Sequence, residues 1–141
     1  RVVKKQSAGG VVFRKINGEL QLLMIRDLKN RWSLPKGSIE NNEETLSAAK
    51  REVFEETGIR NLELIKELGE TKYYFRHRGA INFLTLTLFL FVVKDGLQKI
   101  VVENSKSIIA VEWMPIKEAL EKIEYDDLRN LIESNLESVK L

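Results

Sequence analysis

Three glutamates, Glu52, Glu55 and Glu56, lie within one turn of a predicted helix in this 141-residue sequence. Residues three and four positions apart are neighbours on a helix surface, so the three carboxylates repel one another. A hard divalent cation would remove this repulsion, because Mg²⁺ and Mn²⁺ prefer oxygen ligands and often bind carboxylates together with substrate phosphates. The alternative is a solvated acidic face stabilised by Lys50 and Arg51. The three residues alone leave both interpretations open.

The helix that carries these carboxylates is predicted over residues 43–57. Leu46, Ala49 and Val53 recur at spacings of three and four, which places them on one face of a helix. Gly58 follows as the expected stop signal. The helix therefore has one apolar side for the core and one side of carboxylates.

Strands are predicted before and after this helix. Residues 81–93 alternate so that leucines line one face while threonines and phenylalanines line the other, which indicates a strand buried on both sides. Helices on both faces of a mixed sheet would cover such a strand. The other predicted segments are a hairpin of strands 6–14 and 20–26, an ordered loop at 31–42, strands at 63–76 and 108–113, and helices at 116–123 and 126–138.

Composition excludes several classes of protein. We expect one domain over residues 1–141, with no membrane span, because no apolar run reaches the roughly 18 residues that a bilayer requires. The absence of cysteine removes disulfides and thiolate metal sites and is compatible with a cytoplasmic location, which we expect in the absence of a visible export signal. The net charge of +2 is too small to predict nucleic-acid binding. A monomer or a homodimer is expected.

The segment GSIENNEETLSAAKREVFEETGI, residues 37–59, resembles the signature of the Nudix hydrolase family. Three flanking segments extend the resemblance over nearly the whole chain: AGGVVF at 8–13, WSLPKG at 32–37 and VEWMPIKEAL at 111–120. The residues at the nine fixed positions of the signature are Gly37, Glu43, Arg51, Glu52, Val53, Glu55, Glu56, Gly58 and Ile59.

The resemblance implies an α/β/α sandwich, with a mixed β-sheet between helices, in which this segment binds Mg²⁺ or Mn²⁺. It implies catalytic roles for Arg51 and the three glutamates, the glutamates as metal ligands and Arg51 as a residue that orients them. It implies structural roles for Gly37, Glu43 and Gly58. Further metal ligands implied are the backbone carbonyl of Lys36 and a downstream glutamate; Ser107 occupies the usual position of that glutamate, and Glu103 is the nearest replacement.

The activity implied is hydrolysis of a nucleoside diphosphate linked to another group. The LPKG sequence resembles the branch that cleaves dinucleoside polyphosphates such as diadenosine tetraphosphate, although Leu84 stands where that branch often has lysine. Lys36 could contact a substrate phosphate. His77, which follows Arg76 in a basic cluster, is a further candidate for substrate binding. If 71–76 is a strand, Lys72, Tyr74 and Arg76 share a face that could bind a polyphosphate and a base, whereas Tyr73 and Phe75 would face the core.

Other substrates remain open for the same metal site: modified nucleoside triphosphates, ADP-ribose and nucleotide sugars. A non-catalytic nucleotide sensor is the alternative from a different class, but such domains commonly lose carboxylates that this sequence retains. An RNA-cap substrate is disfavoured by the absence of a strongly basic extension. The expected partner is thus a small nucleotide.

Overall fold

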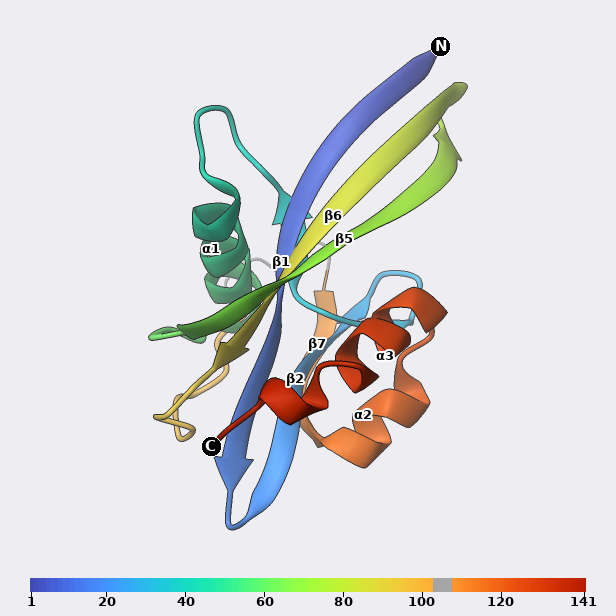
Figure 1. Ribbon diagram of the computed structural model, residues 1–141. Helices are drawn as coiled ribbons and strands as arrows, with labels where there is room; N and C mark the ends of the chain where they lie inside the picture. Colours follow the sequence, from blue (N-terminus) through green and yellow to red (C-terminus); the bar gives the residue numbers. More distant parts are fainter. Residues whose placement is uncertain (103–107) are drawn as a thin grey trace.

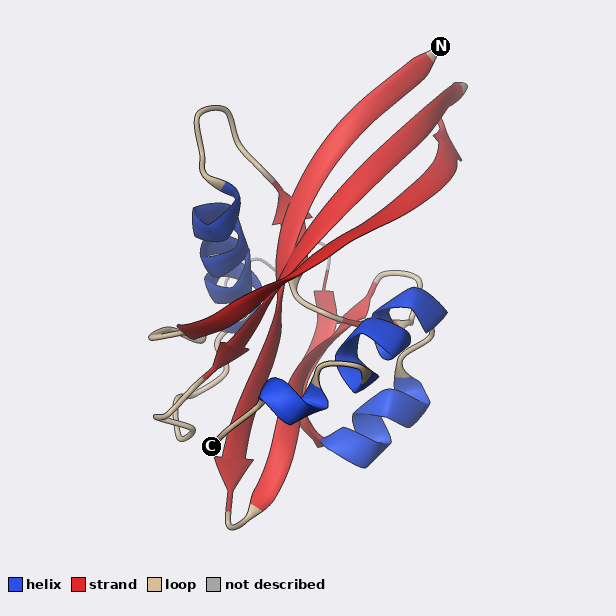
Figure 2. Ribbon diagram, in the orientation of Figure 1, coloured by secondary structure: helices blue, strands red, loops and turns tan. Residues whose placement is uncertain are grey.

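The computed structural model describes residues 1–102 and 108–141, which form a mixed sheet between two layers of helices (Figures 1 and 2). The strands are β1 (Val2–Ile16), β2 (Glu19–Asp27), β3 (Trp32–Ser33), β4 (Lys36–Ser38), β5 (Glu63–His77), β6 (Ala80–Val92) and β7 (Ile108–Pro115). The helices are α1 (Thr45–Thr57), α2 (Ile116–Lys122), α3 (Asp126–Glu133) and a 3₁₀ turn, η1 (Leu136–Ser138).

The strands of the described residues form one sheet in the order β3-β2-β1-β6-β5. Strand β7 pairs with β2, and β4 pairs with β1. The β1–β6 pair is parallel and the other pairs are antiparallel, so the sheet is mixed as predicted. Helix α1 covers one face, whereas α2 and α3 cover the other (Figure 1). This arrangement confirms the predicted α/β/α sandwich.

Strand β6 is buried on both faces along its second half, which confirms the alternation seen in the sequence. Leu86, Leu88 and Leu90 belong to the apolar cluster beneath α2 and α3, and all three are almost inaccessible to solvent. Phe89 and Phe91 belong to the cluster beneath α1. Each face of this one strand therefore contributes to a separate core.

Helix α1 packs through the residues that its periodicity predicts. Ala49 and Val53 are fully buried in the cluster beneath the helix. The helix ends at Gly58, whose φ of 79° lies in the left-handed region, and its N–H donates a hydrogen bond of 2.8 Å to the carbonyl of Phe54. Glycine adopts this conformation without the steric cost that a side chain brings. The predicted stop signal is confirmed.

The segment predicted as a loop at 31–42 contains two short strands. The three residues of β4 pair antiparallel with β1, with Gly37 opposite Ala8. The pairing partners lie far away in the sequence, and a three-residue strand is too short to show a period of two, so local pattern could not reveal it. This pairing fixes β4 between β1 and α1.

Strands β1, β5 and β6 extend together beyond the helices (Figure 1). We call this extension the distal arm, and it comprises Val2–Gln6, Lys72–His77 and Ala80–Thr85, in which the three strands remain paired. Among the described residues, no helix is long and apolar enough to span a membrane.

Candidate active site

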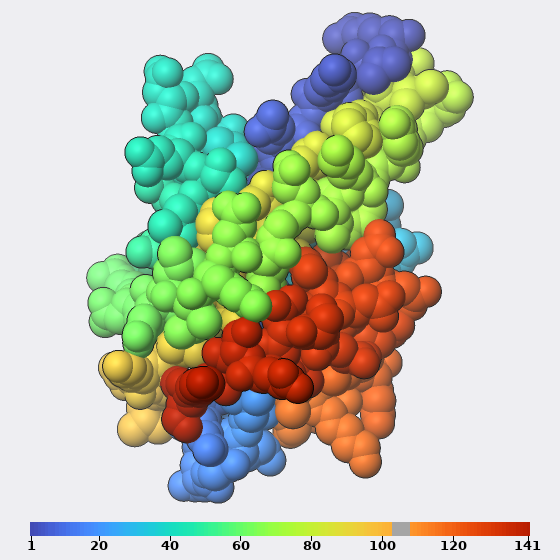
Figure 3. Space-filling view, in the orientation of Figure 1, coloured from blue at the N-terminus to red at the C-terminus, as the bar shows by residue number. Residues whose placement is uncertain are grey.

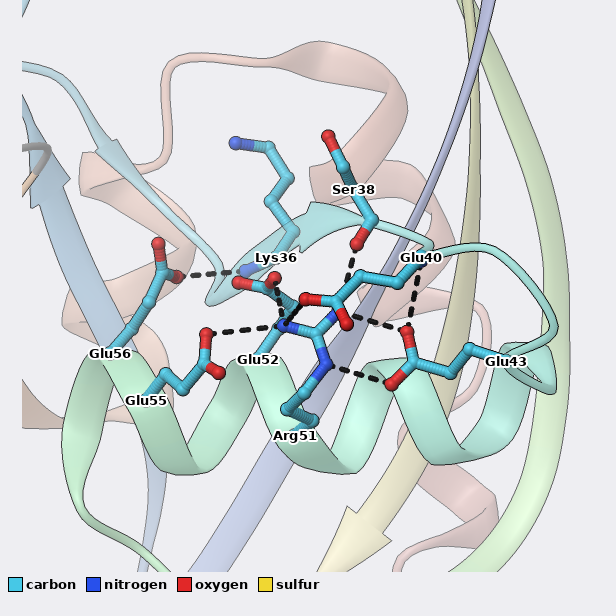
Figure 4. Close-up of polar contacts among 8 residues, drawn as sticks. All are labelled: Lys36, Ser38, Glu40, Glu43, Arg51, Glu52, Glu55 and Glu56. Carbon is cyan, nitrogen blue, oxygen red and sulfur yellow. Dashed lines mark hydrogen bonds and ion pairs between the residues drawn. The ribbon is translucent and has the colours of Figure 1, made fainter.

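The three glutamates of α1 project from the helix surface that faces β4 (Figure 4). The backbone N–H of Lys36 donates a hydrogen bond of 2.9 Å to Oε1 of Glu56, while the Lys36 side chain points away from α1. The neighbouring Pro35 carbonyl accepts a 3.1 Å hydrogen bond from the N–H of Gly10, which ties this segment to β1. The strand and the helix thus hold the backbone of Lys36 and the Glu56 carboxylate in fixed contact.

Gly37 permits the close approach of β4 to Glu52. A Cβ atom at position 37 would lie 2.5 Å from Oε1 of Glu52, and closer still to its Cδ and Oε2 atoms. The Glu52 carboxylate therefore fills the space of the missing side chain.

Arg51 explains how the helix tolerates its carboxylates. Its guanidinium binds both oxygens of Glu43, with Nε–Oε2 and Nη2–Oε1 distances of 2.7 and 2.9 Å. It also donates through Nη1 to Glu52 at 2.8 Å and to Glu55 at 3.1 Å, and through Nη2 to the Ser38 carbonyl at 2.9 Å. A planar guanidinium suits such multiple charge-assisted bonds. Arg51 thus contacts both carboxylates that the resemblance expects it to orient.

The carboxylates differ in their affinity for protons. The hydrogen bond from Arg51 lowers the pKa of Glu43 to about 2. Burial raises the pKa of Glu56 to about 7 and also raises the pKa of Glu52. A carboxylate that loses water without gaining a full countercharge favours its neutral form. Glu52 and Glu56 therefore lie where an added positive charge would stabilise them.

A hard divalent cation fits this donor chemistry. The three carboxylates are oxygen donors, and burial raises the pKa of Glu52 and of Glu56 despite the hydrogen bonds that each accepts. Among residues 1–102 and 108–141, however, no three acidic or histidine side chains converge as a set of metal ligands, and Arg51 binds Glu52 and Glu55. A bound cation would thus compete with Arg51 for these oxygens. The further ligand expected at Glu103 lies outside the described residues.

Two adjoining hollows open beside Lys36. The first, of about 360 Å³, is bounded by Glu56. The second, of about 380 Å³, is lined by aromatic side chains and by Ser33. The buried hydroxyl of Ser33 has no hydrogen-bond partner among the described atoms. Both hollows are lined by Lys29, Lys36 and Tyr125, so they form one cleft. The second hollow is also lined by Arg31, Tyr73, Tyr74, Phe75, Leu84 and Leu128.

The expected substrate-binding residues separate into two groups. Lys36 lines both hollows, and Tyr74 borders the second one, although its side chain alternates to the sheet face opposite that of Tyr73 and Phe75. Lys72 and Arg76 stand outside both hollows, as far as the described residues show. His77 lies at the end of β5 and lines a different hollow of about 240 Å³ at the tip of the distal arm.

The expectation that Phe75 faces the core is wrong, because 41% of this residue is exposed. Tyr73 is half-buried against the core beneath α3, as expected, yet both residues line the cleft. The predicted alternation along β5 is correct, because Tyr73 and Phe75 share the face that is directed toward α3. Strand β5 extends beyond α3, however, so this face borders the cleft at Phe75 and no helix of the described residues covers it. Burial at this position depends on which helix lies above the strand.

Sequence reasoning missed Lys29, Arg31 and Tyr125. Lys29 lies in the turn between β2 and β3, Arg31 follows that turn, and Tyr125 precedes α3. The only local signal was a cluster of basic residues in the 26–31 segment. Tyr125 carried none, because its place in the cleft depends on how α3 packs against the sheet.

A family model described as the NUDIX domain matches residues 4–134. An RNA pyrophosphohydrolase of Bartonella henselae is 44% identical over 80 residues, which cover 52% of this chain and 44% of that protein. A Mycobacterium tuberculosis protein named MutT4 is 36% identical over 140 residues, which cover 94% of this chain and 55% of that protein. The chain thus spans about half the length of these curated relatives.

Among solved structures, the Ap4A hydrolase of Caenorhabditis elegans in a binary complex shares the fold. Its TM-score is 0.69 at 19% sequence identity, over 92% of this chain and 93% of that one. At this level of identity, the likeness concerns the arrangement of helices and strands.

Proposed function

This chain belongs to the Nudix family, and we propose that it is a pyrophosphohydrolase that depends on a divalent cation and cleaves a nucleoside diphosphate linked to another group. The observation that carries the proposal is the junction of the glutamates of α1 with the cationic and aromatic cleft. Glu56 both contacts the Lys36 backbone and borders this cleft. Anionic ligands for a cation and a binding site for a nucleotide therefore meet at one place.

The metal site of the proposal comprises Glu52, Glu55 and Glu56, with the Lys36 carbonyl and Glu103 as the further expected ligands. Mg²⁺ or Mn²⁺, when bound, neutralises charge on the diphosphate and makes a bound water more acidic. Arg51 keeps Glu52 and Glu55 in position through its hydrogen bonds to both. Gly37 leaves room for the Glu52 carboxylate against β4.

The cleft accounts for a substrate that combines phosphates with a base. Lys29 and Lys36 line both hollows and can contact phosphate oxygens as point charges. Tyr125 and Phe75 provide aromatic surface for a base in the second hollow. The phosphates would then lie between the aromatic side chains and Glu56.

The best candidate substrate is a dinucleoside polyphosphate such as diadenosine tetraphosphate. Two adjoining hollows of about 360 and 380 Å³ suit a ligand with more than one bulky part. The LPKG sequence supports the same choice. Modified nucleoside triphosphates, ADP-ribose and nucleotide sugars are smaller alternatives for the same cleft.

A 5′-phosphorylated RNA end is a second candidate. The relative that is 44% identical to this chain over 80 residues is an RNA pyrophosphohydrolase. A 5′-triphosphate end presents the same linked phosphates and a first base, so the same cleft could bind it.

Product analysis tests these candidates. The protein with Mg²⁺ is incubated separately with diadenosine tetraphosphate, ADP-ribose and a 5′-triphosphate RNA oligonucleotide. Release of ATP and AMP from diadenosine tetraphosphate is the expected result. Rapid cleavage of ADP-ribose or of the RNA end without cleavage of diadenosine tetraphosphate would reject the first candidate. No cleavage of any of the three substrates, with Mg²⁺ or with Mn²⁺ in its place, would favour a nucleotide sensor.

A further inference from the structure

The distal arm presents an open sheet face on the side of α1. Strand register places Lys4, Phe83 and Tyr74 in one row across β1, β6 and β5. The rows before and after it on the same face are Val2, Ile81 and Arg76, and Gln6, Thr85 and Lys72. Of these nine residues, Phe83 and Thr85 are partly buried and the rest are exposed. We call these nine residues the distal face.

The distal face is cationic. Lys4, Lys72 and Arg76 lie on it, and no Asp or Glu occurs in the three segments of the distal arm; the nearest carboxylate on the same face of β5 is Glu70, one row beyond Lys72. None of these three cations forms an ion pair with a carboxylate of the described residues. The net charge of the chain is small, but folding gathers positive charge here. Such a surface attracts a polyanion.

The middle row of the distal face is aromatic. The rings of Tyr74 and Phe83 lie 4.6 Å apart with an interplanar angle of 32°, and 73% of Tyr74 is exposed. An exposed ring between cations on an open sheet is a platform on which unpaired bases can stack while the cations bind the backbone phosphates. Figures 1 and 3 show that the arm projects beyond the helices, which leaves room for a long ligand.

The distal face is continuous with the candidate active site. Ala8 continues the face of Lys4 along β1, and it pairs with Gly37 beside the carboxylates. Lys4 is four residues from Ala8, which is about 13 Å at 3.3 Å per residue. A chain whose end lies at the carboxylates can reach the distal face within a few nucleotides.

We propose that the distal face binds single-stranded RNA. The bound segment would follow a 5′-phosphorylated end that lies at the carboxylates of α1. The inference rests on the RNA substrate of the proposed function. A second copy of this chain is a poor occupant, because a two-fold contact would place one cationic distal face against another.

The proposal is tested by measuring equilibrium binding of a fluorescent, single-stranded uridine RNA of about twelve nucleotides. The RNA carries a 5′-hydroxyl end, so the measurement does not depend on hydrolysis. We expect saturable binding that weakens as salt rises from about 50 to 200 mM. Tyr74→Ala should raise Kd by about tenfold or more, whereas Tyr74→Phe should largely retain binding. Lys4→Ala should reduce the slope of log K against log salt by about 0.7.

The matched control is Lys117→Ala, which removes an exposed lysine of α2 on the opposite side of the sheet. It should bind RNA like the unchanged protein. Absence of RNA binding, or equal effects of Tyr74→Ala and Lys117→Ala, would overturn the proposal. A homodimer that Tyr74→Ala dissociates would also overturn it and assign the face to a second copy. If diadenosine tetraphosphate is hydrolysed while RNA does not bind, only this inference fails.

Discussion

The carboxylate of Glu52 occupies the space that a side chain at Gly37 would need, because a Cβ atom there would lie within 2.5 Å of Oε1. The two residues belong to β4 and α1, and the register of β4 with β1 fixes their approach. The geometry of the glutamates thus depends on a strand of three residues.

Replacement of Gly37 by alanine tests this dependence. The end of a glutamate side chain is flexible, so Gly37→Ala should displace the Glu52 carboxylate while the fold persists. A displacement of about 1 Å can reduce catalysis by about 100-fold. Hydrolysis rates and circular dichroism check the prediction, with Ser38→Ala in the same strand as the control. Activity equal to that of the control would contradict the role of Gly37.

Glu56→Gln should separate chemistry from folding. Glutamine can still accept the hydrogen bond from the Lys36 N–H, but it brings no negative charge to a cation. We expect turnover to fall by at least about 100-fold, with a weaker rise of the melting temperature on addition of Mg²⁺. The exposed Lys50→Ala on the same helix is the control. Unchanged turnover would place the metal elsewhere.

Arg51→Lys should destabilise the protein although the charge is retained. An ammonium cannot reproduce the paired bonds that Arg51 makes to both oxygens of Glu43. Because the side chain of Arg51 is 23% exposed, solvent screening reduces the loss, which we expect at about 1–2 kcal/mol in the free energy of unfolding. Urea denaturation measures it. A midpoint like that of the unchanged protein would show that the paired geometry is dispensable.

Glu43 should make stability depend on pH in the acid range. Its pKa is about 2 in the folded protein, below the ordinary value of 4.5 that applies on unfolding. The unfolded state therefore binds more protons between these values, so the contribution of Glu43 is complete above the unfolded pKa and is lost as pH falls toward 2. Urea midpoints of the protein and of Glu43→Gln should converge as pH falls from 4.5 toward 2. Parallel curves would contradict the assignment.

Phe75→Ala tests the aromatic hollow. We expect KM for diadenosine tetraphosphate to rise by about tenfold with a smaller change in kcat, because the ring offers surface to a base that does not react. Leu97→Ala removes an exposed apolar side chain, 82% accessible, outside the hollow and serves as the control. Equal KM values for the two variants would show that the base binds elsewhere.

Much of the fold could be predicted from local pattern. The period of α1, its stop at Gly58 and the two-sided burial of β6 each depend on residues close in the sequence. The outcome for β4 was different, since its pairing with β1 joins segments that local pattern cannot connect. Phe75 was misplaced for a related reason, because alternation gives the face of a side chain but not what covers it.

The sequence by itself determined which family the chain belongs to and which residues are expected as oxygen ligands beside the arginine, because their types and spacing along one helix are local properties. Only the tertiary structure decided that Tyr125, Lys29 and Lys36 share a cleft, and that the cations of the distal face gather on one surface. The physical reason is that a helix fixes neighbours three and four residues apart, whereas clefts and charged surfaces form where distant segments pair and pack.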